Sequence, residues 1–197
     1  MKTISISDKN LYNVVNKVLW DGGVVMHPTE TCYGLAADIF NRSALEKVYA
    51  LKEMSFEKPV SILVDGLGMA QEFGLFSDKA FDLANEYWPG PLSILVPRSK
   101  ELPDFLNEGN DFVSMRYSSM DFCMNMVKEF GRPVTTTSAN KTTEPQLYVP
   151  DASSLKGVDL LVDGGEINNN KPSTIVKVDG DDLLILRQGD LILRQTD

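Results

Sequence analysis

The sequence predicts a mixed α/β protein, and three observations support this fold class. Short apolar runs alternate with segments of helical periodicity through the middle of the chain. The last strands follow one another without an intervening helix, which a purely parallel sheet would not show. The 197 residues contain no internal repeat, low-complexity segment or linker, so we expect residues 1–197 to form a single domain with a sizeable core.

The elements of the first half are helices and buried strands in alternation. In order, we expect helix 11–19, strand 24–26, helix 43–52, strand 60–64, helix 77–87 and strand 92–96. Gly22 and Gly23 end the first helix, and Pro28 stops the first strand because it lacks an N–H for the ladder. Ser43 and Glu46 form a capping-box pattern for the second helix. The motif WPGP (residues 88–91) ends the third helix abruptly.

The second half adds strands 112–116, 133–137 and 159–162, helix 121–130, and a final hairpin of strands 174–178 and 183–186. Alternating apolar and polar residues predict the strand that ends at Arg116. Asp121 is expected to cap the helix, which Gly131 closes. Gly180 lies in the hairpin turn.

Composition excludes several classes of protein. The 43% hydrophobic and 24% charged residues are ordinary for a soluble protein, and no apolar run approaches the roughly 20 residues of a membrane span. The N-terminal residues lack the apolar segment of a secretory signal. Cys32 and Cys123 cannot make a disulfide framework, and no CxxC or histidine cluster indicates a metal site, so a reducing cytoplasm is the simplest location. The net charge of −9 argues against direct nucleic-acid binding over a large surface.

Polar side chains follow the first strand directly. Thr29, Glu30 and Thr31 lie beside Tyr33 and Gly34, where backbone can approach a ligand closely. This pattern is typical of a ligand loop, but taken alone it fits an ordinary surface turn better.

Other loops and strand ends present cations, hydroxyls and an amide. These are Lys52, Lys58, Arg116, Ser138, Asn140, Ser173, Thr174 and Arg187. A polyphosphate needs such a lining, and ligands favour the carboxyl ends of strands in open α/β sheets. The chain has neither a GxxxxGK[ST] nor a GxGxxG loop. From spacing alone, the prediction stops at an anion-binding cleft.

The order of several motifs resembles the YrdC/YciO family. They are HPTETCYGLAAD, ALEKVYALK, KPVSILV, WPGPLSILV, VSMRYS, GRPVTTTSANKT, LVDGG, KPSTIVKV and ILRQGD, and together they run from about Val24 to Asp190. The resemblance implies a twisted mixed sheet with flanking helices and a concave basic ligand cleft. It also implies synthesis of threonylcarbamoyl-AMP and pyrophosphate from L-threonine, bicarbonate and ATP. The product would pass to a transferase that makes N6-threonylcarbamoyladenosine in tRNA.

The resemblance also implies roles for particular residues. Lys52, Ser138 and Asn140 match the family's KxR…SxN signature and would hold the ATP phosphates. Ser173 and Arg187 would face the nucleotide. Thr31 and Arg116 would lie near threonine and the triphosphate. The full set of expected site residues is Thr29, Thr31, Tyr33, Lys52, Lys58, Arg116, Ser138, Asn140, Ser173 and Arg187, with Lys52 and Arg116 as the catalytic cations.

Met54 departs from the family, which has arginine at this position. A thioether cannot make a bidentate bond to phosphate. Either Lys58 supplies the charge, or ATP binds weakly, or the chain is a paralogue with an altered reaction. An RNA-binding module is a further alternative, which the acidic net charge disfavours. A Mg²⁺ on the ATP phosphates is compatible with the reaction, although the sequence offers no carboxylate cluster to hold it.

Four residues of the first loop have alternative interpretations. His27 could shuttle protons, but we favour a structural role at the strand end. Glu30 could act as a general base, orient the substrate ammonium or brace the loop. Cys32 is interpreted as a packing residue because no base is in evidence near it. Tyr33 could pack against the ligand or the core.

Overall fold

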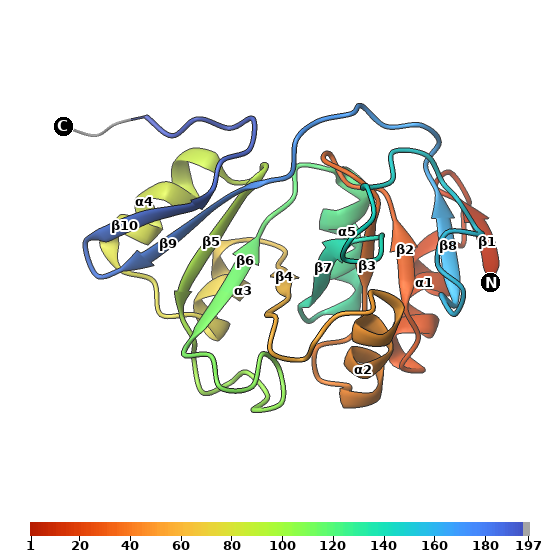
Figure 1. The fold of residues 1–197 in the computed structure, drawn as a ribbon, viewed down its shortest axis with the longest axis horizontal. Helices are drawn as coiled ribbons and strands as arrows, with labels where there is room; N and C mark the ends of the chain where they lie inside the picture. The colour runs from red at the N-terminus through yellow and green to blue at the C-terminus, as the bar shows by residue number, and fades with distance from the viewer. Residues whose placement is uncertain (195–197) are drawn as a thin grey trace.

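The computed structural model describes residues 1–194 and contains a ten-stranded sheet (Figure 1). Its strand order is β1-β8-β2-β3-β7-β4-β6-β5-β9-β10. The strands are β1 (Lys2–Ser5), β2 (Val25–His27), β3 (Gly34–Ala36), β4 (Ser61–Leu63), β5 (Leu92–Pro97), β6 (Phe112–Arg116), β7 (Val134–Ser138), β8 (Leu160–Asp163), β9 (Thr174–Asp179) and β10 (Asp182–Arg187). Four neighbouring pairs are parallel and five are antiparallel, so the predicted mixed sheet is confirmed.

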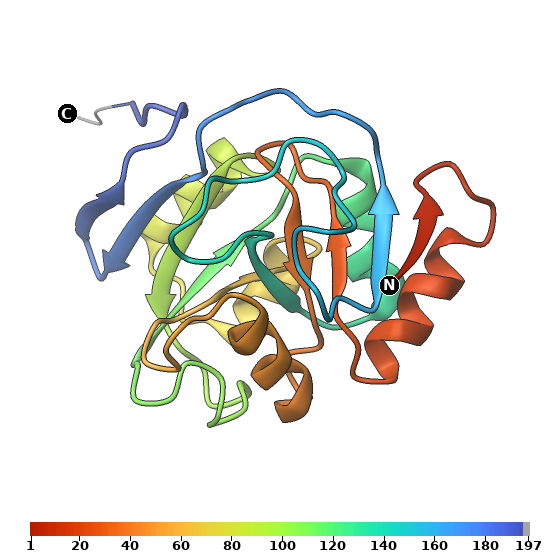
Figure 2. The same cartoon turned by 45° about the vertical axis from the view of Figure 1, so that its right-hand side comes forward.

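Helices cover both faces of the sheet, as the alternation of apolar side chains dictates. They are α1 (Leu11–Trp20), α2 (Arg42–Leu51), α3 (Leu67–Phe73), α4 (Asp78–Tyr87) and α5 (Asp121–Phe130). Val25 and Ala36 pack in one cluster with α1 and α5. Their neighbours Met26 and Leu35 pack in another cluster with α2, which lies in front of the sheet in Figures 1 and 2. Strands β2 and β3 are therefore buried on both faces.

Strand β7 lies in the middle of the sheet and joins its two halves. It pairs antiparallel with β3 on one side, where Ser138 is opposite Gly34. It pairs antiparallel with β4 on the other side, where Thr136 is opposite Ser61. This arrangement brings the polar end of β7 beside the loop that follows β2.

A long connection between β8 and β9, residues 164–173, runs across the top of the molecule from one half of the sheet to the other (Figures 1 and 2). It delivers Ser173 to the start of β9, which pairs with β5. Residues 139–159 pass over the front of the sheet between β7 and β8 (Figure 2). These two segments complete the rim of the site.

Most predicted elements are confirmed, and three elements had not been predicted. The additions are β1, β3 and α3. The predicted cap of α2 is wrong, because Asn41 rather than Ser43 accepts the hydrogen bond from Ala44 N. The predicted cap of α5 is also shifted by one residue, to Met120.

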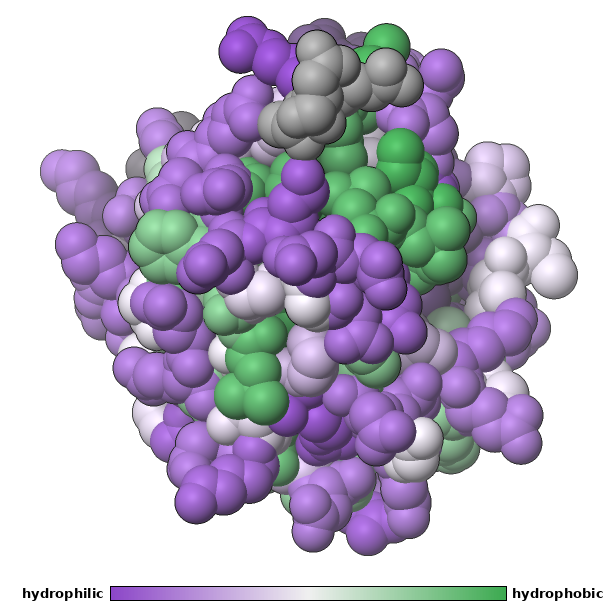
Figure 3. All heavy atoms as spheres, turned by 90° about the vertical axis from the view of Figure 1, so that its left-hand side faces the viewer, coloured by the Kyte–Doolittle hydropathy of each residue, from purple (hydrophilic) through white to green (hydrophobic). Residues whose placement is uncertain are grey.

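The edge strand β10 carries an apolar surface, seen in Figure 3 at the end of the sheet beside α4. Leu184, Ile185 and Leu186 are exposed there. Within residues 1–194, none of the helices is long and apolar enough to cross a membrane.

Candidate active site

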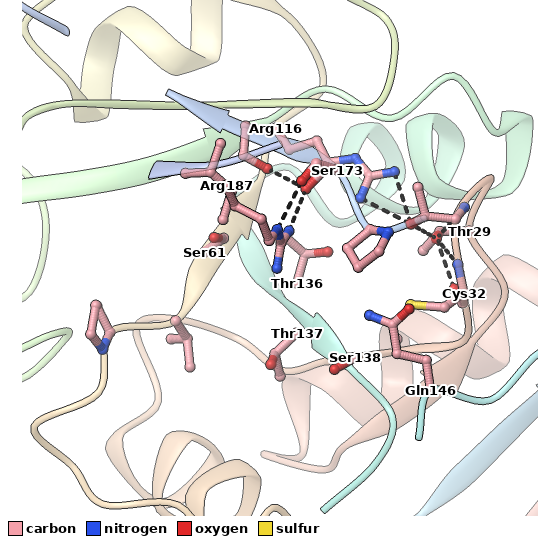
Figure 4. Close-up of a pocket in the computed structure, with 17 residues that line it drawn as sticks. Thr29, Cys32, Ser61, Arg116, Thr136, Thr137, Ser138, Gln146, Ser173 and Arg187 are labelled. Carbon is pink, nitrogen blue, oxygen red and sulfur yellow. Dashed lines mark hydrogen bonds between the residues drawn. The ribbon is translucent and has the colours of Figure 1, made fainter. Parts of the chain in front are cut away.

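A cavity opens where the two halves of the sheet meet at β7 (Figure 4). Its lining contains 17 residues, namely Thr29, Thr31, Cys32, Gly34, Pro59, Val60, Ser61, Ser93, Arg116, Thr136, Thr137, Ser138, Gln146, Pro172, Ser173, Ile175 and Arg187. These come from separate loops and strands across the chain. The lining carries two guanidinium groups and eight hydroxyls, and in the part of the chain that the structure describes it includes no Asp or Glu. Such a lining suits an anionic ligand.

The loop after β2 is braced by its own threonine. Thr29 Oγ1 accepts hydrogen bonds from the backbone N–H groups of Thr31 at 3.1 Å and Cys32 at 3.2 Å. The same hydroxyl lies 2.7 Å from Cys32 O, to which it donates. Thr29 therefore fixes the turn that directs the next side chains into the cavity.

Arg116 crosses from the end of β6 to this loop. Its two terminal nitrogens each donate to Thr31 Oγ1 at 3.2 Å, and one forms an ion pair with Glu30 at 2.7 Å. The side chain of Arg116 is only 6% exposed and that of Glu30 19%. The guanidinium is thus held in place before any ligand arrives, while its Nε has no partner among the described residues.

Glu30 braces the loop and is not a free base. Besides Arg116, its carboxylate accepts hydrogen bonds from the Ser118 hydroxyl and from Ser119 N. Burial would raise the pKa of Glu30, but the charge of Arg116 and these hydrogen bonds outweigh it and leave the pKa below its usual value. The carboxylate stays ionised at neutral pH, and its partners occupy it.

Lys52 lies behind the lining and holds the end of β7. Its Nζ donates to Ser138 O at 2.6 Å and to Asn140 O at 2.9 Å, and the residue is almost fully buried. Burial lowers the pKa of Lys52 to about 8. The ammonium therefore sets the position of Ser138, which itself lines the cavity.

Asn140 does not line the cavity. Its Nδ2 donates to Lys141 O at 2.9 Å and to Glu144 O at 2.6 Å, and these bonds close the turn after β7. Its Oδ1 is buried and has no partner among the described residues.

The second guanidinium is held by the start of β9. Arg187 Nε donates to Ser173 O at 2.9 Å, and another Arg187 nitrogen donates to Ser173 Oγ at 3.0 Å. Ser93 Oγ lies 2.9 Å from Ser173 Oγ and supports it from β5. Burial, and then the charge of Arg116, lower the pKa of Arg187. The two cations repel each other, so an anion between them would be stabilised.

Four expected site residues do not line the cavity. They are Lys52 and Asn140, described above, and Tyr33 and Lys58. Met54 does not line it either. Tyr33 is fully buried and its hydroxyl donates to Gly165 O at 2.7 Å, so it packs in the core. Lys58 is exposed on the loop before β4. Met54 packs against the apolar cluster beneath α2, α3 and α4. The cation that the sequence lacks at position 54 is therefore not replaced by Lys58 in this structure.

The surroundings of His27 and Cys32 favour structural roles for both residues rather than catalytic ones. His27 is fully buried, burial lowers its pKa to about 4, and its Nδ1 lies 3.0 Å from Pro28 O. The neutral ring thereby supports the first turn of the loop. Cys32 lines the cavity, but burial raises the pKa of its thiol, which disfavours the nucleophilic thiolate.

Five polar lining residues were not predicted, namely Ser61, Ser93, Thr136, Thr137 and Gln146. Two of them carried a signal in the sequence, because Ser61 and Ser93 each begin the letters SILV inside an apolar strand. A hydroxyl within a buried strand needs a partner or a ligand. Ser93 has the partner Ser173, and Ser61 bonds Ser114 Oγ at 2.8 Å.

Comparison with known proteins gives a consistent result. A family model for Sua5, YciO and YrdC proteins, described as "Telomere recombination", matches residues 17–189. A Methanocaldococcus jannaschii protein provisionally named a threonylcarbamoyl-AMP synthase is 31% identical over 185 residues, covering 92% of this chain and 86% of that protein. The threonylcarbamoyl-AMP synthase of Vibrio campbellii is 29% identical over 187 residues, covering 92% of this chain and all of that protein.

A solved structure shares the fold. The crystal structure of Pyrococcus abyssi Sua5 complexed with L-threonine superposes with a TM-score of 0.89 at 24% identity. The match covers 96% of this chain and 57% of that protein, so this chain spans little more than half the length of that relative.

Proposed function

Because the chain belongs to the family of Sua5, YciO and YrdC proteins, we propose that it is a threonylcarbamoyl-AMP synthase. In this reaction L-threonine, bicarbonate and ATP give threonylcarbamoyl-AMP and pyrophosphate. The enzyme is a nucleotidyltransferase, because an adenylyl group moves from pyrophosphate to a carboxylate.

One observation carries the proposal. Side chains from the loop after β2 and from the ends of β6, β7 and β10 meet in one cavity with two guanidiniums, eight hydroxyls and, within residues 1–194, no carboxylate. A triphosphate and an amino-acid carboxylate are both anions that this lining would bind. The converging residues include Arg116, Ser138 and Arg187.

The reaction needs positioning and charge neutralisation rather than an enzyme nucleophile. The nitrogen of the neutral threonine amine forms a bond to the carbon of CO₂, with loss of a proton, or of bicarbonate, with loss of water, and gives an N-carboxylate. A carboxylate oxygen then forms a bond to the α-phosphorus of ATP, and the bond from that phosphorus to the bridging oxygen of pyrophosphate breaks. Arg116 and Arg187 stabilise the charge on the phosphates, while Ser138 and Ser173 donate neutral hydrogen bonds.

Lys52 acts on this site through Ser138. Its ammonium bonds the carbonyl of Ser138 and adds positive charge behind the lining. A Mg²⁺ bound to the ATP phosphates would arrive with the substrate. The described residues contain no group of three or more His, Cys, Asp or Glu that could hold one independently, and no step above depends on it.

The product is a reactive mixed anhydride, so its consumer would be a transferase. The resemblance to the family implies that this transferase modifies tRNA. Both cysteines are free and buried, which is compatible with a reducing cytoplasm. We place the reaction there.

The direct test is release of pyrophosphate from ATP by the purified protein. Release should require L-threonine and bicarbonate together. Arg116→Met should lower the rate strongly, while Arg42→Met, which removes an exposed arginine on α2, should not. Release that is indifferent to threonine would contradict the proposal.

The position of Met54 favours one alternative, a paralogue with a changed reaction. Its side chain joins the apolar cluster, so the arginine of the family motif has no counterpart there. Met54→Arg separates the two cases. A synthase weakened by this loss should gain ATP affinity, by about tenfold for a bond to a charged group, whereas a paralogue should still make no threonylcarbamoyl-AMP.

A further inference from the structure

Gln146 lines the cavity, and the mechanism above gives it no role. Among the 17 lining residues, all of which the structure describes, it has the single side-chain amide. Figure 4 shows its amide end pointing into the cavity, below Cys32 and beside Ser138.

The two residues that follow Gln146 in the sequence fix its backbone through hydrogen bonds. Leu147 O accepts a hydrogen bond from Tyr33 N at 2.8 Å, within the loop after β2. Tyr148 O accepts one from Ile167 N at 2.9 Å, within the connection between β8 and β9. Gln146 is therefore positioned by two other segments of the site.

The side chain of Gln146 is held from one end. The Tyr148 hydroxyl lies 3.3 Å from Gln146 Oε1 and 3.3 Å from Asn170 O. Gln146 Nε2 makes no hydrogen bond within residues 1–194, so its two N–H donors are free for a ligand.

The charges of the site decide which end of the amide serves the ligand. An amide oxygen and nitrogen exchange by a half-turn of the group, and an anion selects the nitrogen. The lining with two guanidiniums and no carboxylate selects an anion. At the Ser138 end, Lys52 is already bonded to two carbonyls and Met54 packs against the apolar cluster, so the side-chain donors that line this end are hydroxyls and the amide of Gln146.

We propose that Gln146 donates from Nε2 to a phosphate oxygen of ATP at the Ser138 end of the cavity. This inference rests on the proposed function only for the identity of the nucleotide. Its chemical content is that a neutral amide supplies a further donor beside Ser138. Gln146 is thus a determinant of affinity for the polyphosphate.

The test measures binding of inorganic pyrophosphate by titration calorimetry, without threonine or turnover. Gln146→Leu keeps the shape and removes the donors, so affinity should fall about tenfold or more. Gln146→Glu should lose still more, because it adds like charge, and Gln146→Lys should retain or exceed wild-type affinity. Gln71→Leu, on the exposed face of α3, is the matched control and should bind as wild type.

Two further measurements separate this role from a structural one. The variants should keep the melting temperature of the wild type, and the KM for ATP should rise in Gln146→Leu with little change in kcat. Pyrophosphate binding by Gln146→Leu within twofold of wild type would overturn the inference, as would equal binding by Gln146→Glu. If Gln146 governs pyrophosphate affinity in a protein that makes no threonylcarbamoyl-AMP, the inference stands and the proposed function fails.

Discussion

The ion pair between Glu30 and Arg116 should be a main source of stability in the site, and Glu30→Gln tests it. The change removes the charge that balances a guanidinium whose side chain is 6% exposed. Breaking a buried ion pair from one side costs about 3–5 kcal/mol, because the remaining charge is buried without compensation. Glu30 is 19% exposed, so water relieves part of this penalty and we expect a loss of roughly 3 kcal/mol.

The effect of pH on this pair has a definite sign. The folded pKa of Glu30 is lower than its unfolded value of 4.5, so the folded state binds fewer protons than the unfolded state in the window below that value. The stabilisation is therefore complete above about pH 4.5 and is lost as the pH falls through the folded pKa. Glu30→Gln should lack this part of the acid sensitivity.

The assay is urea unfolding at pH 7 and in acid, with the slope m compared between proteins to confirm that the same surface is exposed. Glu53→Gln is the matched control, because its partner Lys141 at 2.6 Å lies in an exposed pair, 38% and 64% exposed. Exposed pairs contribute little to stability. Equal unfolding free energies for wild type and Glu30→Gln at pH 7 would refute the reasoning.

Three further predictions concern single positions. The pKa of His27 is about 4 in the folded state and near 6.5 in the unfolded state, so the free energy of unfolding should fall by roughly 3 kcal/mol as the pH falls from 6.5 to 4. In urea unfolding, the free energy of unfolding of His27→Gln should depend less steeply on pH. An equally steep pH dependence would contradict the burial of a neutral ring. Lys52 has a pKa of about 8, so pyrophosphate affinity should decline as the pH rises through 8. Calorimetry should show no such decline in Lys52→Arg. A pyrophosphate affinity of the wild type that does not change with pH would argue against a role for the ammonium charge. Gly189→Ala would place a Cβ 2.1 Å from Pro172 O, so the free energy of unfolding measured in urea should fall by about 1–3 kcal/mol. Pyrophosphate binding should also weaken, because the displaced backbone carries Arg187. Stability and binding equal to those of the wild type would show that this contact relaxes freely.

Local pattern predicted the elements with a clear apolar run or helical periodicity, including the three-residue strands β2 and β4, and missed β1, β3 and α3. Strand β3 has three residues. It pairs with β2 and β7, which only the folded sheet brings beside it. The strand at β1 is a mostly exposed edge of four residues, KTIS, without an apolar run. Helix α3 follows Gly66, and its seven residues include Gly68, which a propensity argument counts against a helix.

The site residues likewise fall into those that the sequence predicted and those that it did not. The motif residues Arg116, Ser138 and Arg187 are the last residues of their strands, which sequence periodicity locates well, and they do line the cavity. Lys58 and Tyr33 are close to these motifs in sequence, but the direction of a side chain depends on tertiary packing. Gln146 lies in an irregular segment, and contacts with two distant loops decide its placement.

The most direct measurement of the central claim is the fate of labelled carbon. The purified protein would be incubated with ATP, L-threonine and ¹³C-bicarbonate, and the adenylate would be examined by mass spectrometry. We expect a threonylcarbamoyl-AMP that carries the label in its carbamoyl group, with an equal amount of pyrophosphate. An adenylate that forms without incorporation of the label, or no adenylate under conditions in which ATP is bound, would contradict the account.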